Sequence, residues 1–360
     1  MSKIEFGVIG AGWRCEFFIR IARACPDRFK LSGVVARNPE KAAAFEAQWG
    51  GGVKTFRMLD QLLEQTSPSF VITSESWDAN PELLKQLAAR GMPALSETPP
   101  APDVERMTEL FRAVGKARGK IQVAEQVHLR PHHQAQLAVA HSGKLGRISQ
   151  AQVSVAHGYH GISLMRRLLG ISFEDCTISG SRFRSPIVKG PGRAGPPEKE
   201  TVGESTQDFF RFDFGDQLGT IDFTGDQYFA WIRNERLLVR GDRGEIADME
   251  VSWLKDFRTP LKNTFVRHHN GLNGDLSPHS LAGIQLGDEW VFRNPFPNAA
   301  LMDDEIAIAT ALVKMDECAR TGREFYPLAE GMQDHYLNLL AQQATAAGAA
   351  IQSQRQVWAS

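Results

Sequence analysis

Apolar residues in the first third of the chain occur in short unbroken runs separated by helically spaced stretches. The runs that predict buried strands lie near residues 4–9, 31–36, 69–73, 93–95 and 121–124. Between them, apolar residues recur every three or four positions, which predicts intervening helices. Strands that alternate with helices form a parallel sheet with crossover helices, and ligands bind outside the carboxyl ends of such strands.

Near residue 148 the hydrophobic pattern changes to a strict two-residue alternation. This period predicts antiparallel strands with one wetted face, at residues 148–157, 209–225, 236–251 and 288–296. Further helices are expected at 162–169, 302–321 and 332–349. Residues 185–204 are rich in Gly, Pro and charge and have no period, which predicts a long loop, either a lid or a disordered segment.

The first predicted strand runs into a glycine turn and then a helix, in the sequence KIEFGVIGAGWRCEFF. Gly10 permits a tight turn, and Gly12 lets a pyrophosphate approach the main chain. Cys15 occupies the third small position of the G-x-G-x-x-G/A pattern. The following helix would present amide groups and a positive dipole end to an anion. This context favours a dinucleotide site over a simple Gly-rich turn.

The residue after the second strand bears on the choice of dinucleotide. An NAD enzyme places a carboxylate there to hold the ribose 2′-hydroxyl. This chain has Ala36 followed by Arg37, and a guanidinium suits a 2′-phosphate better. We therefore expect NADP or NAD with NADP slightly favoured, the alternative being that Arg37 is a surface arginine.

These patterns together predict an α/β protein of 360 residues, too long for one ordinary core. Residues 1–125 are expected to form a Rossmann doubly wound parallel sheet that binds the dinucleotide. Residues 126–330 are expected to form an α+β substrate and oligomerisation domain with an open, mostly antiparallel sheet. Residues 331–360 would be a C-terminal helix that packs back on the body.

Charge and composition limit the cellular compartments and the classes of binding partner that we expect. A net charge of −1 argues against nucleic-acid and anionic-membrane partners. No apolar run approaches transmembrane length, and the N-terminus lacks the pattern of a signal peptide. The four cysteines are scattered without a C-x-x-C pair, which suggests free thiols in a reducing compartment. We expect a cytoplasmic protein with a small-molecule substrate.

Two groups of histidines are candidates for acid–base chemistry, because imidazole titrates near neutral pH. One group follows the last strand of the first domain: His128, His132 and His133. The other comprises His157 and His160, with Tyr159 between them, at a strand-to-helix corner. A single histidine is more often a structural or surface residue, but the position of His160 favours a catalytic role. No metal site is expected, since no Cys or carboxylate spacing supports one.

With these residues in view, nearly the whole chain resembles the Gfo/Idh/MocA family of NAD(P)-dependent oxidoreductases, which act mainly on sugars and polyols. The resemblance rests on the segments GVIGAGWR, VVARNPEKAAAF, GMPALSETPPA, EQVHLRP, KLGRI and GYHGISLMRRLLG. It implies that the cofactor contacts Gly10, Ala11, Gly12, Trp13 and Arg14 in the turn and Arg37, Ser74, Glu97 and Gln126 at strand ends. It also implies a homodimer or homotetramer that associates through the second-domain sheet.

The departures from the family pattern concern catalysis. The family's Glu-Lys-Pro is here Glu97-Thr98-Pro99, so the ammonium is missing and Thr98 can only hydrogen-bond. The family's Asp-x-Gly-x-His-x-x-Asp is represented by Ala156, Gly158, His160 and Ser163. An arginine common before the proline of the sixth-strand segment is replaced by His128, with Arg130 beside it.

Three functions remain open. The first is oxidation or reduction of a sugar, cyclitol or related hydroxyl or carbonyl compound, with His160 as acid/base. His157, Tyr159 and Thr98 would support catalysis, and His128 and Arg130 would contact substrate. The second is glycoside cleavage that uses the cofactor transiently without net redox change. The third is a catalytically silent dinucleotide-binding protein.

Overall fold

The computed structural model describes residues 3–271, 274, 277 and 279–359. The chain forms two structural units, each assembled from segments that are distant in the sequence. The first comprises Met1–Pro131, His268–Ala282 and Asn294–Met332. The second comprises His132–Arg267, Gly283–Arg293 and Gln333–Ser360. None of the helices in the described part of the chain is both long and apolar enough to cross a bilayer.

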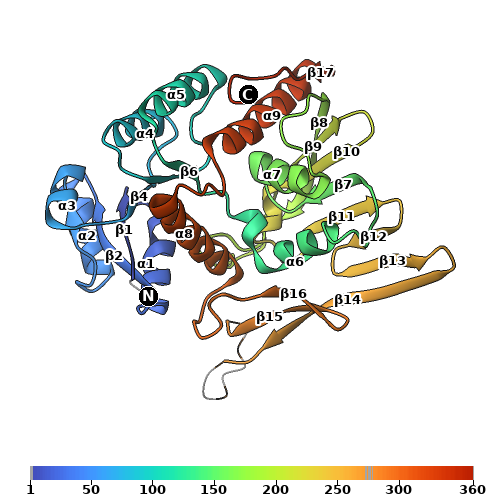
Figure 1. Cartoon of the computed structure of the whole chain (residues 1–360), viewed down its shortest axis with the longest axis horizontal. Helices are drawn as coiled ribbons and strands as arrows, with labels where there is room; N and C mark the ends of the chain where they lie inside the picture. Colours follow the sequence, from blue (N-terminus) through green and yellow to red (C-terminus); the bar gives the residue numbers. More distant parts are fainter. Residues whose placement is uncertain (1–2, 272–273, 275–276, 278, 360) are drawn as a thin grey trace. The chain divides into compact units, whose positions relative to one another are not determined.

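The first unit contains a six-stranded parallel sheet in the order β3-β2-β1-β4-β5-β6 (Figure 1). Its strands are β1 (Ile4–Ile9), β2 (Phe29–Val35), β3 (Thr55–Phe56), β4 (Phe70–Thr73), β5 (Ala94–Ser96) and β6 (Ile121–Val123). The order reverses between β1 and β4, and the crevice at such a reversal is where doubly wound sheets bind ligands. The glycine turn follows β1 directly.

Helices cover this sheet because each buries an apolar face. They are α1 (Cys15–Ala24), α2 (Pro39–Gln48), α3 (Leu59–Gln65), α4 (Asn80–Ala89), α5 (Val104–Ala117) and α8 (Asp303–Thr321), with the short η1 (Val127–Leu129) after β6. Phe6 of β1 stacks on Phe70 of β4 with ring centroids 6.0 Å apart, and Phe18 of α1 meets Phe6 edge-on at 6.4 Å. All three rings are fully buried, so the core lies directly beneath the glycine turn.

The second unit is built on an eleven-stranded sheet in the order β16-β15-β14-β13-β12-β11-β7-β10-β9-β8-β17. Its strands are β7 (Ile148–Ser154), β8 (Thr177–Val188), β9 (Val202–Asp213), β10 (Leu218–Thr224), β11 (Arg236–Gly241), β12 (Gly244–Ala247), β13 (Glu250–Asp256), β14 (Thr259–His269), β15 (Leu281–Leu286), β16 (Glu289–Arg293) and β17 (Ile351–Gln352). Except for the parallel pair β7–β10, the pairs whose register is resolved are antiparallel. The predicted fold class is therefore confirmed.

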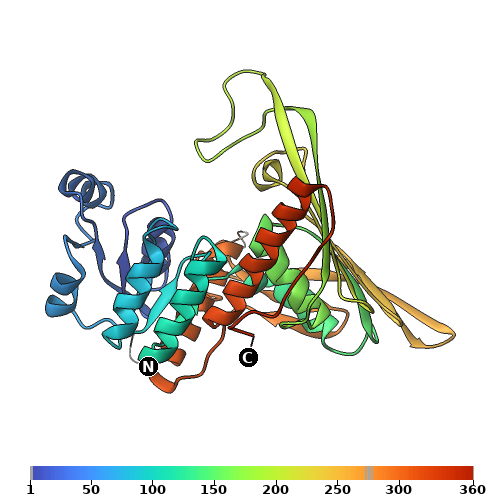
Figure 2. The same ribbon diagram turned by 90° about the horizontal axis from the view of Figure 1, so that it is seen from above.

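Helices α7 (Gly158–Leu169) and α9 (Leu328–Ala347) lie on one face of this sheet (Figure 2). The contact is close: a Cβ at Gly219 of β10 would lie 2.0 Å from the Met165 sulfur of α7. Inward residues such as Val153 and Ile221 are buried, whereas Asp222 on the opposite face remains accessible. Helix α6 (Pro131–Ala140) and the short η2 (Gly225–Tyr228) complete the unit.

The predicted loop at 185–204 is too long, because both of its ends belong to strands. Strands β8 and β9 stay paired as far as Val188 and Val202, so only residues 189–201 connect them, at the top of Figure 2. Much of β8 here is exposed, including Ser181 through Arg184. Because neither face of this part of the hairpin is fully buried, the sequence carries no two-residue period to reveal it.

Candidate functional site

The glycine turn at the end of β1 has the geometry that the sequence predicts. Gly10 has a φ of 108°, and a Cβ there would lie 2.3 Å from the carbonyl oxygen of Ser74 after β4. Only glycine fits this close approach. A Cβ at Gly12, by contrast, would meet no atom within 4 Å. The turn therefore leaves open space beside Gly12, which is what a pyrophosphate approaching the main chain requires.

Helix α1 begins just after this space. Arg14 is the N-cap residue, and no side chain caps the helix. The amides of Cys15, Glu16 and Phe17 donate to the carbonyls of Gly12, Trp13 and Arg14, so an anion here would meet the main chain of the glycine turn, with the positive end of the helix dipole behind it. Burial raises the pKa of the Cys15 thiol to about 12, so Cys15 adds no negative charge at neutral pH. Trp13 is half exposed at the mouth of the turn.

The ends of β5 and β6 carry polar atoms whose hydrogen-bonding capacity is not used within the described chain. The Glu97 carboxylate has one oxygen, Oε1, 3.3 Å from Nε of Arg14. Its other oxygen, Oε2, and the Oε1 of Gln126 are both buried and have no hydrogen-bond partner among the described residues. Buried polar atoms rarely remain unsatisfied. The first unit thus brings the glycine turn, Ser74, Glu97 and Gln126 to the carboxyl edge of one sheet, and their arrangement fits a dinucleotide.

Arg37 lies just beyond β2 and interacts with the end of β4. Its Nη2 atom is 2.9 Å from Oε2 of Glu75, and the Arg37 side chain is 72% exposed. A guanidinium and a carboxylate thus occupy the position where the adenosine ribose is held in this fold. Glu75 is far from Arg37 along the chain, so their pairing depends on the tertiary structure.

Three predicted catalytic or substrate residues belong to the first unit. Thr98 and His128 are buried, and the His128 ring lies 5.2 Å from the Tyr326 ring. Arg130 donates from Nε to Oδ1 of Asp304 at 2.6 Å, which ties η1 to the start of α8. The Arg130 side chain is therefore already held by the protein.

The second unit brings the other predicted catalytic residues together at the start of α7. His157 precedes the helix and is exposed, whereas Tyr159 and His160 are buried. The His160 ring centroid lies 5.0 Å from that of His157 and 4.5 Å from that of Tyr159. Gly158 has a φ of 45°, and a Cβ there would lie 2.6 Å from Oδ1 of Asn338, so glycine is needed at this corner.

Two residues of this cluster were missed by sequence reasoning. The Tyr228 hydroxyl lies 2.6 Å from Nδ1 of His157 and accepts a hydrogen bond from the His157 amide at 3.1 Å. The His335 ring on α9 lies 5.7 Å from that of Tyr159. A buried ion pair of 2.6 Å between Arg166 and Asp334 holds α7 against α9. Both missed residues come from distant parts of the chain, so no spacing could have revealed them.

Comparison with known proteins is consistent with this geometry. Residues 4–125 match the model of an oxidoreductase family with the NAD-binding Rossmann fold, GFO_IDH_MocA. No curated protein matches the chain significantly.

Solved structures similar to this fold cover almost the whole chain. One is an oxidoreductase from Agrobacterium radiobacter in complex with NAD+, L-tartaric acid and magnesium, with a TM-score of 0.67, 16% identity, and coverage of 97% of this chain and 98% of that one. Another is a myo-inositol dehydrogenase from Corynebacterium glutamicum, with a TM-score of 0.64, 14% identity, and coverage of 98% and 99%. A third is aldose-aldose oxidoreductase from Caulobacter crescentus complexed with glycerol, with a TM-score of 0.62, 17% identity, and coverage of 98% and 100%.

At these identities the structural matches show a shared fold, and the match to the family model extends over the segment that carries the glycine turn and the strand ends. The resemblance stated from the sequence is thereby confirmed for residues 4–125, which match the NAD-binding Rossmann domain of the GFO_IDH_MocA oxidoreductase family.

Proposed function

We propose that the protein is an NAD(P)-dependent oxidoreductase that acts on a hydroxyl or carbonyl group of a sugar, cyclitol or related small molecule. The observation that carries this proposal is the open space beside Gly12 at the start of α1. The similarity to a myo-inositol dehydrogenase and an aldose-aldose oxidoreductase supports the choice of substrate class.

The bound nicotinamide dinucleotide would supply the hydride acceptor or donor. The backbone of Ala11, Gly12 and Trp13 would bind its pyrophosphate, and Arg14 would hold Glu97 at the edge of the site. Ser74 and Gln126 would line the strand ends. We propose NADP as the preferred form, with Arg37 at the 2′-phosphate. In that case Arg37 must exchange its contact with Glu75 for the phosphate.

Proton transfer to or from the substrate would fall to the histidine cluster of the second unit. We assign the acid/base role to His160, which is 8% exposed, so few water molecules reach it. His157 would support it, with Tyr228 fixing the His157 ring, and Tyr159 would line the same cluster.

The remaining predicted residues would contact the substrate from the first unit. Thr98 would offer a hydroxyl in place of the family's ammonium, which supplies a hydrogen bond but no charge. His128 is the candidate substrate contact. Arg130 would contribute through guanidinium nitrogens other than the Nε that Asp304 occupies.

A substrate panel with both nicotinamide cofactors tests the proposal. A sustained change in reduced-cofactor absorbance with polyols or their carbonyl forms, lost in His160→Gln, is the expected result. Cleavage of a glycoside without net absorbance change would instead indicate the redox-neutral alternative. Tight cofactor binding with no turnover on any substrate would indicate a silent binding protein.

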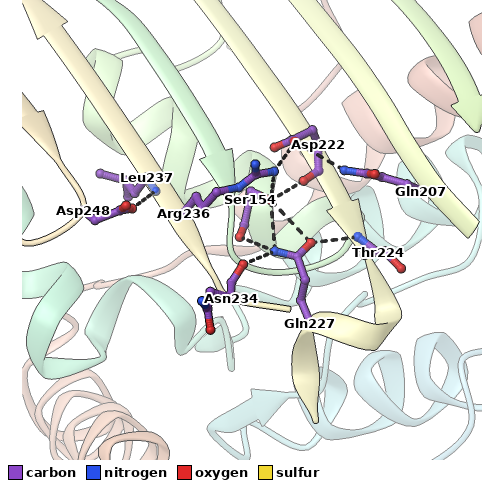
Figure 3. A network of polar contacts seen from close by, with 9 residues as sticks. All are labelled: Ser154, Gln207, Asp222, Thr224, Gln227, Asn234, Arg236, Leu237 and Asp248. Atoms are coloured by element: carbon purple, nitrogen blue, oxygen red, sulfur yellow. Dashed lines mark hydrogen bonds and ion pairs between the residues drawn. The ribbon is translucent and has the colours of Figure 1, made fainter. Parts of the chain in front are cut away.

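We further propose a homodimer or homotetramer that associates through the exposed face of the second-unit sheet. That face contains an open hollow of about 670 Å³, lined by Phe209, Arg211, Asp222 and Arg236 among others. Within it, Arg236 pairs with Asp222 at 2.5 Å (Figure 3). Light scattering should give a mass of two or four chains for the wild type and a smaller mass for Phe209→Glu. A monomeric wild type would rule this out.

The cytoplasm remains our proposed location. All four cysteines are buried free thiols, as a reducing compartment allows.

A further inference from the structure

Two histidines at the start of α6 and a glutamate before β11 meet in the second unit, although they are far apart in the sequence. One potential ligand atom from each of His132, His133 and Glu235 lies within 4.8 Å of the others. The Nε2 of His132 is 3.8 Å from Oε2 of Glu235. Around a tetrahedral ion with bonds of about 2.0–2.2 Å, neighbouring ligand atoms are about 3.4 Å apart. A small rotation of the partly exposed His132 and Glu235 side chains would shorten their separation from 3.8 Å to that distance.

Hydrogen bonds behind the cluster fix which nitrogen of His133 can bind an ion. The Gln136 Nε2 donates to the carbonyl oxygen of Asp248 at 2.8 Å, which orients the amide. Its Oε1 therefore faces Nδ1 of His133 at 2.9 Å and accepts a hydrogen bond from it. In the neutral ring the lone pair is then on Nε2. Metal-binding histidines are oriented in this way, by a second ring nitrogen that donates to an oxygen.

The same hydrogen bonds connect His133 to β11, the strand that directly follows Glu235. Asp248 is joined to Leu237 of β11 by two bonds: the Leu237 amide donates to Oδ1 of Asp248 at 2.7 Å, and the Asp248 amide donates to the Leu237 carbonyl at 2.8 Å. Figure 3 shows the first of these. Leu237 lies two residues after Glu235, so Gln136 and Asp248 hold the first turn of α6 beside the start of β11.

Neighbouring charges and exposure also suit a cation. Arg236, the residue next to Glu235, is paired with Asp222. His133 is buried, whereas the His132 and Glu235 side chains are 23% and 34% exposed. The position between them is thus reachable from solvent, which leaves room for a water molecule to complete the coordination. Two imidazoles and one carboxylate favour zinc over calcium or magnesium.

We propose that His132, His133 and Glu235 form a binding site for a divalent ion of the zinc class, which clamps the start of α6 to the start of β11. No metal-binding spacing is visible in the sequence, because Glu235 lies far from the two histidines along the chain. The site uses none of the residues assigned above to the cofactor or to catalysis, so it stands independently of the proposed oxidoreductase activity.

The test is a titration of the metal-stripped full-length protein with Zn²⁺, and with Co²⁺ as a coloured probe. We expect one ion per chain, with a visible cobalt spectrum of four-coordinate intensity. His132→Gln and Glu235→Gln should lower zinc affinity by more than about tenfold, and Gln136→Leu by about tenfold. The matched controls His279→Gln and Glu245→Gln change residues of the same kinds elsewhere and should leave the affinity unchanged.

X-ray absorption at the zinc edge of the wild type gives a readout that needs no variant. Scattering from two imidazoles and an oxygen ligand is the expected result. The proposal fails if the wild type shows no saturable uptake, if the control variants lose as much affinity as Glu235→Gln, or if the bound zinc shows no imidazole scattering.

Discussion

The Nδ1 atom of His157 lies 2.6 Å from the hydroxyl oxygen of Tyr228, and the His157 amide donates to that same oxygen. The phenol thus holds both the backbone and the ring of His157, at the corner where α7 begins. Removing the Tyr228 hydroxyl should loosen His157 without changing the fold. The rest of the Tyr228 ring remains packed against Phe223, with 4.9 Å between the ring centroids.

Tyr228→Phe should therefore lower kcat with little change in cofactor affinity. We expect a three- to tenfold loss, roughly the value of one hydrogen bond of about 1 kcal/mol. Steady-state kinetics measure this loss of turnover. Tyr336→Phe, which removes a hydroxyl that accepts from the Gln354 amide, is the matched control. Equal losses in both variants would assign Tyr228 a purely structural role.

His160→Gln tests the acid/base assignment. Loss of a general acid/base lowers turnover by about 10²-fold or more, so kcat should fall by at least that factor. Cofactor affinity should be unchanged, because every proposed cofactor residue lies in the first unit. His141→Gln, whose ring nitrogen lies 2.9 Å from the Arg167 carbonyl oxygen, serves as control. Wild-type turnover in His160→Gln would show that another residue is the general acid/base.

The pair formed by Arg37 and Glu75 should govern the choice between NADP and NAD. Arg37→Ala should weaken NADP binding much more than NAD binding, since only NADP carries the 2′-phosphate. Glu75→Gln should strengthen NADP binding, because it removes a carboxylate 2.9 Å from the guanidinium. Calorimetric titration of each variant with both dinucleotides measures these changes. Equal losses of affinity for the two cofactors in Arg37→Ala would show that Arg37 does not bind the 2′-phosphate.

Thiol chemistry should distinguish the folded from the unfolded chain. Burial raises the pKa of Cys15 to about 12, of Cys176 to about 12 and of Cys25 to about 11, so these thiols stay protonated at pH 8. Because the thiolate is the reactive form, a thiol reagent should modify the native protein slowly. All four cysteines should react after denaturation. Rapid modification of Cys15 in the native state would contradict its burial.

The sheet of the first unit could be predicted from the sequence because its signals are local. An apolar run, Gly10 and Gly12, and a helix with buried Phe18 are consecutive in the chain, and the backbone itself forms the glycine turn. The strands around Val153 and Ile221 were equally evident, because one face of the sheet is buried. Periodicity does not indicate that these two strands pair in parallel.

The elements that sequence reasoning missed lack such a pattern. Helix α6 buries polar residues such as His133 and Gln136 together with Leu137, so it shows no amphipathic period. Tyr228 reaches His157, and Glu235 reaches His132, only through the arrangement of strands in the second unit. Contacts between residues so distant in the chain depend on tertiary structure, which periodicity does not encode.

The affinity of the Gly12→Val variant for NADP tests whether a dinucleotide binds at the glycine turn. A Cβ at this position would meet no atom of the described protein within 4 Å, and the φ of Gly12 is not in the left-handed region. The variant should therefore fold with its thermal stability nearly unchanged, whereas Gly10→Ala should destabilise the protein, since its Cβ would strike the Ser74 carbonyl. If the dinucleotide binds there, Gly12→Val should lose at least about tenfold in NADP affinity, because the valine fills the space that the pyrophosphate needs. Wild-type affinity in a folded Gly12→Val protein would contradict it.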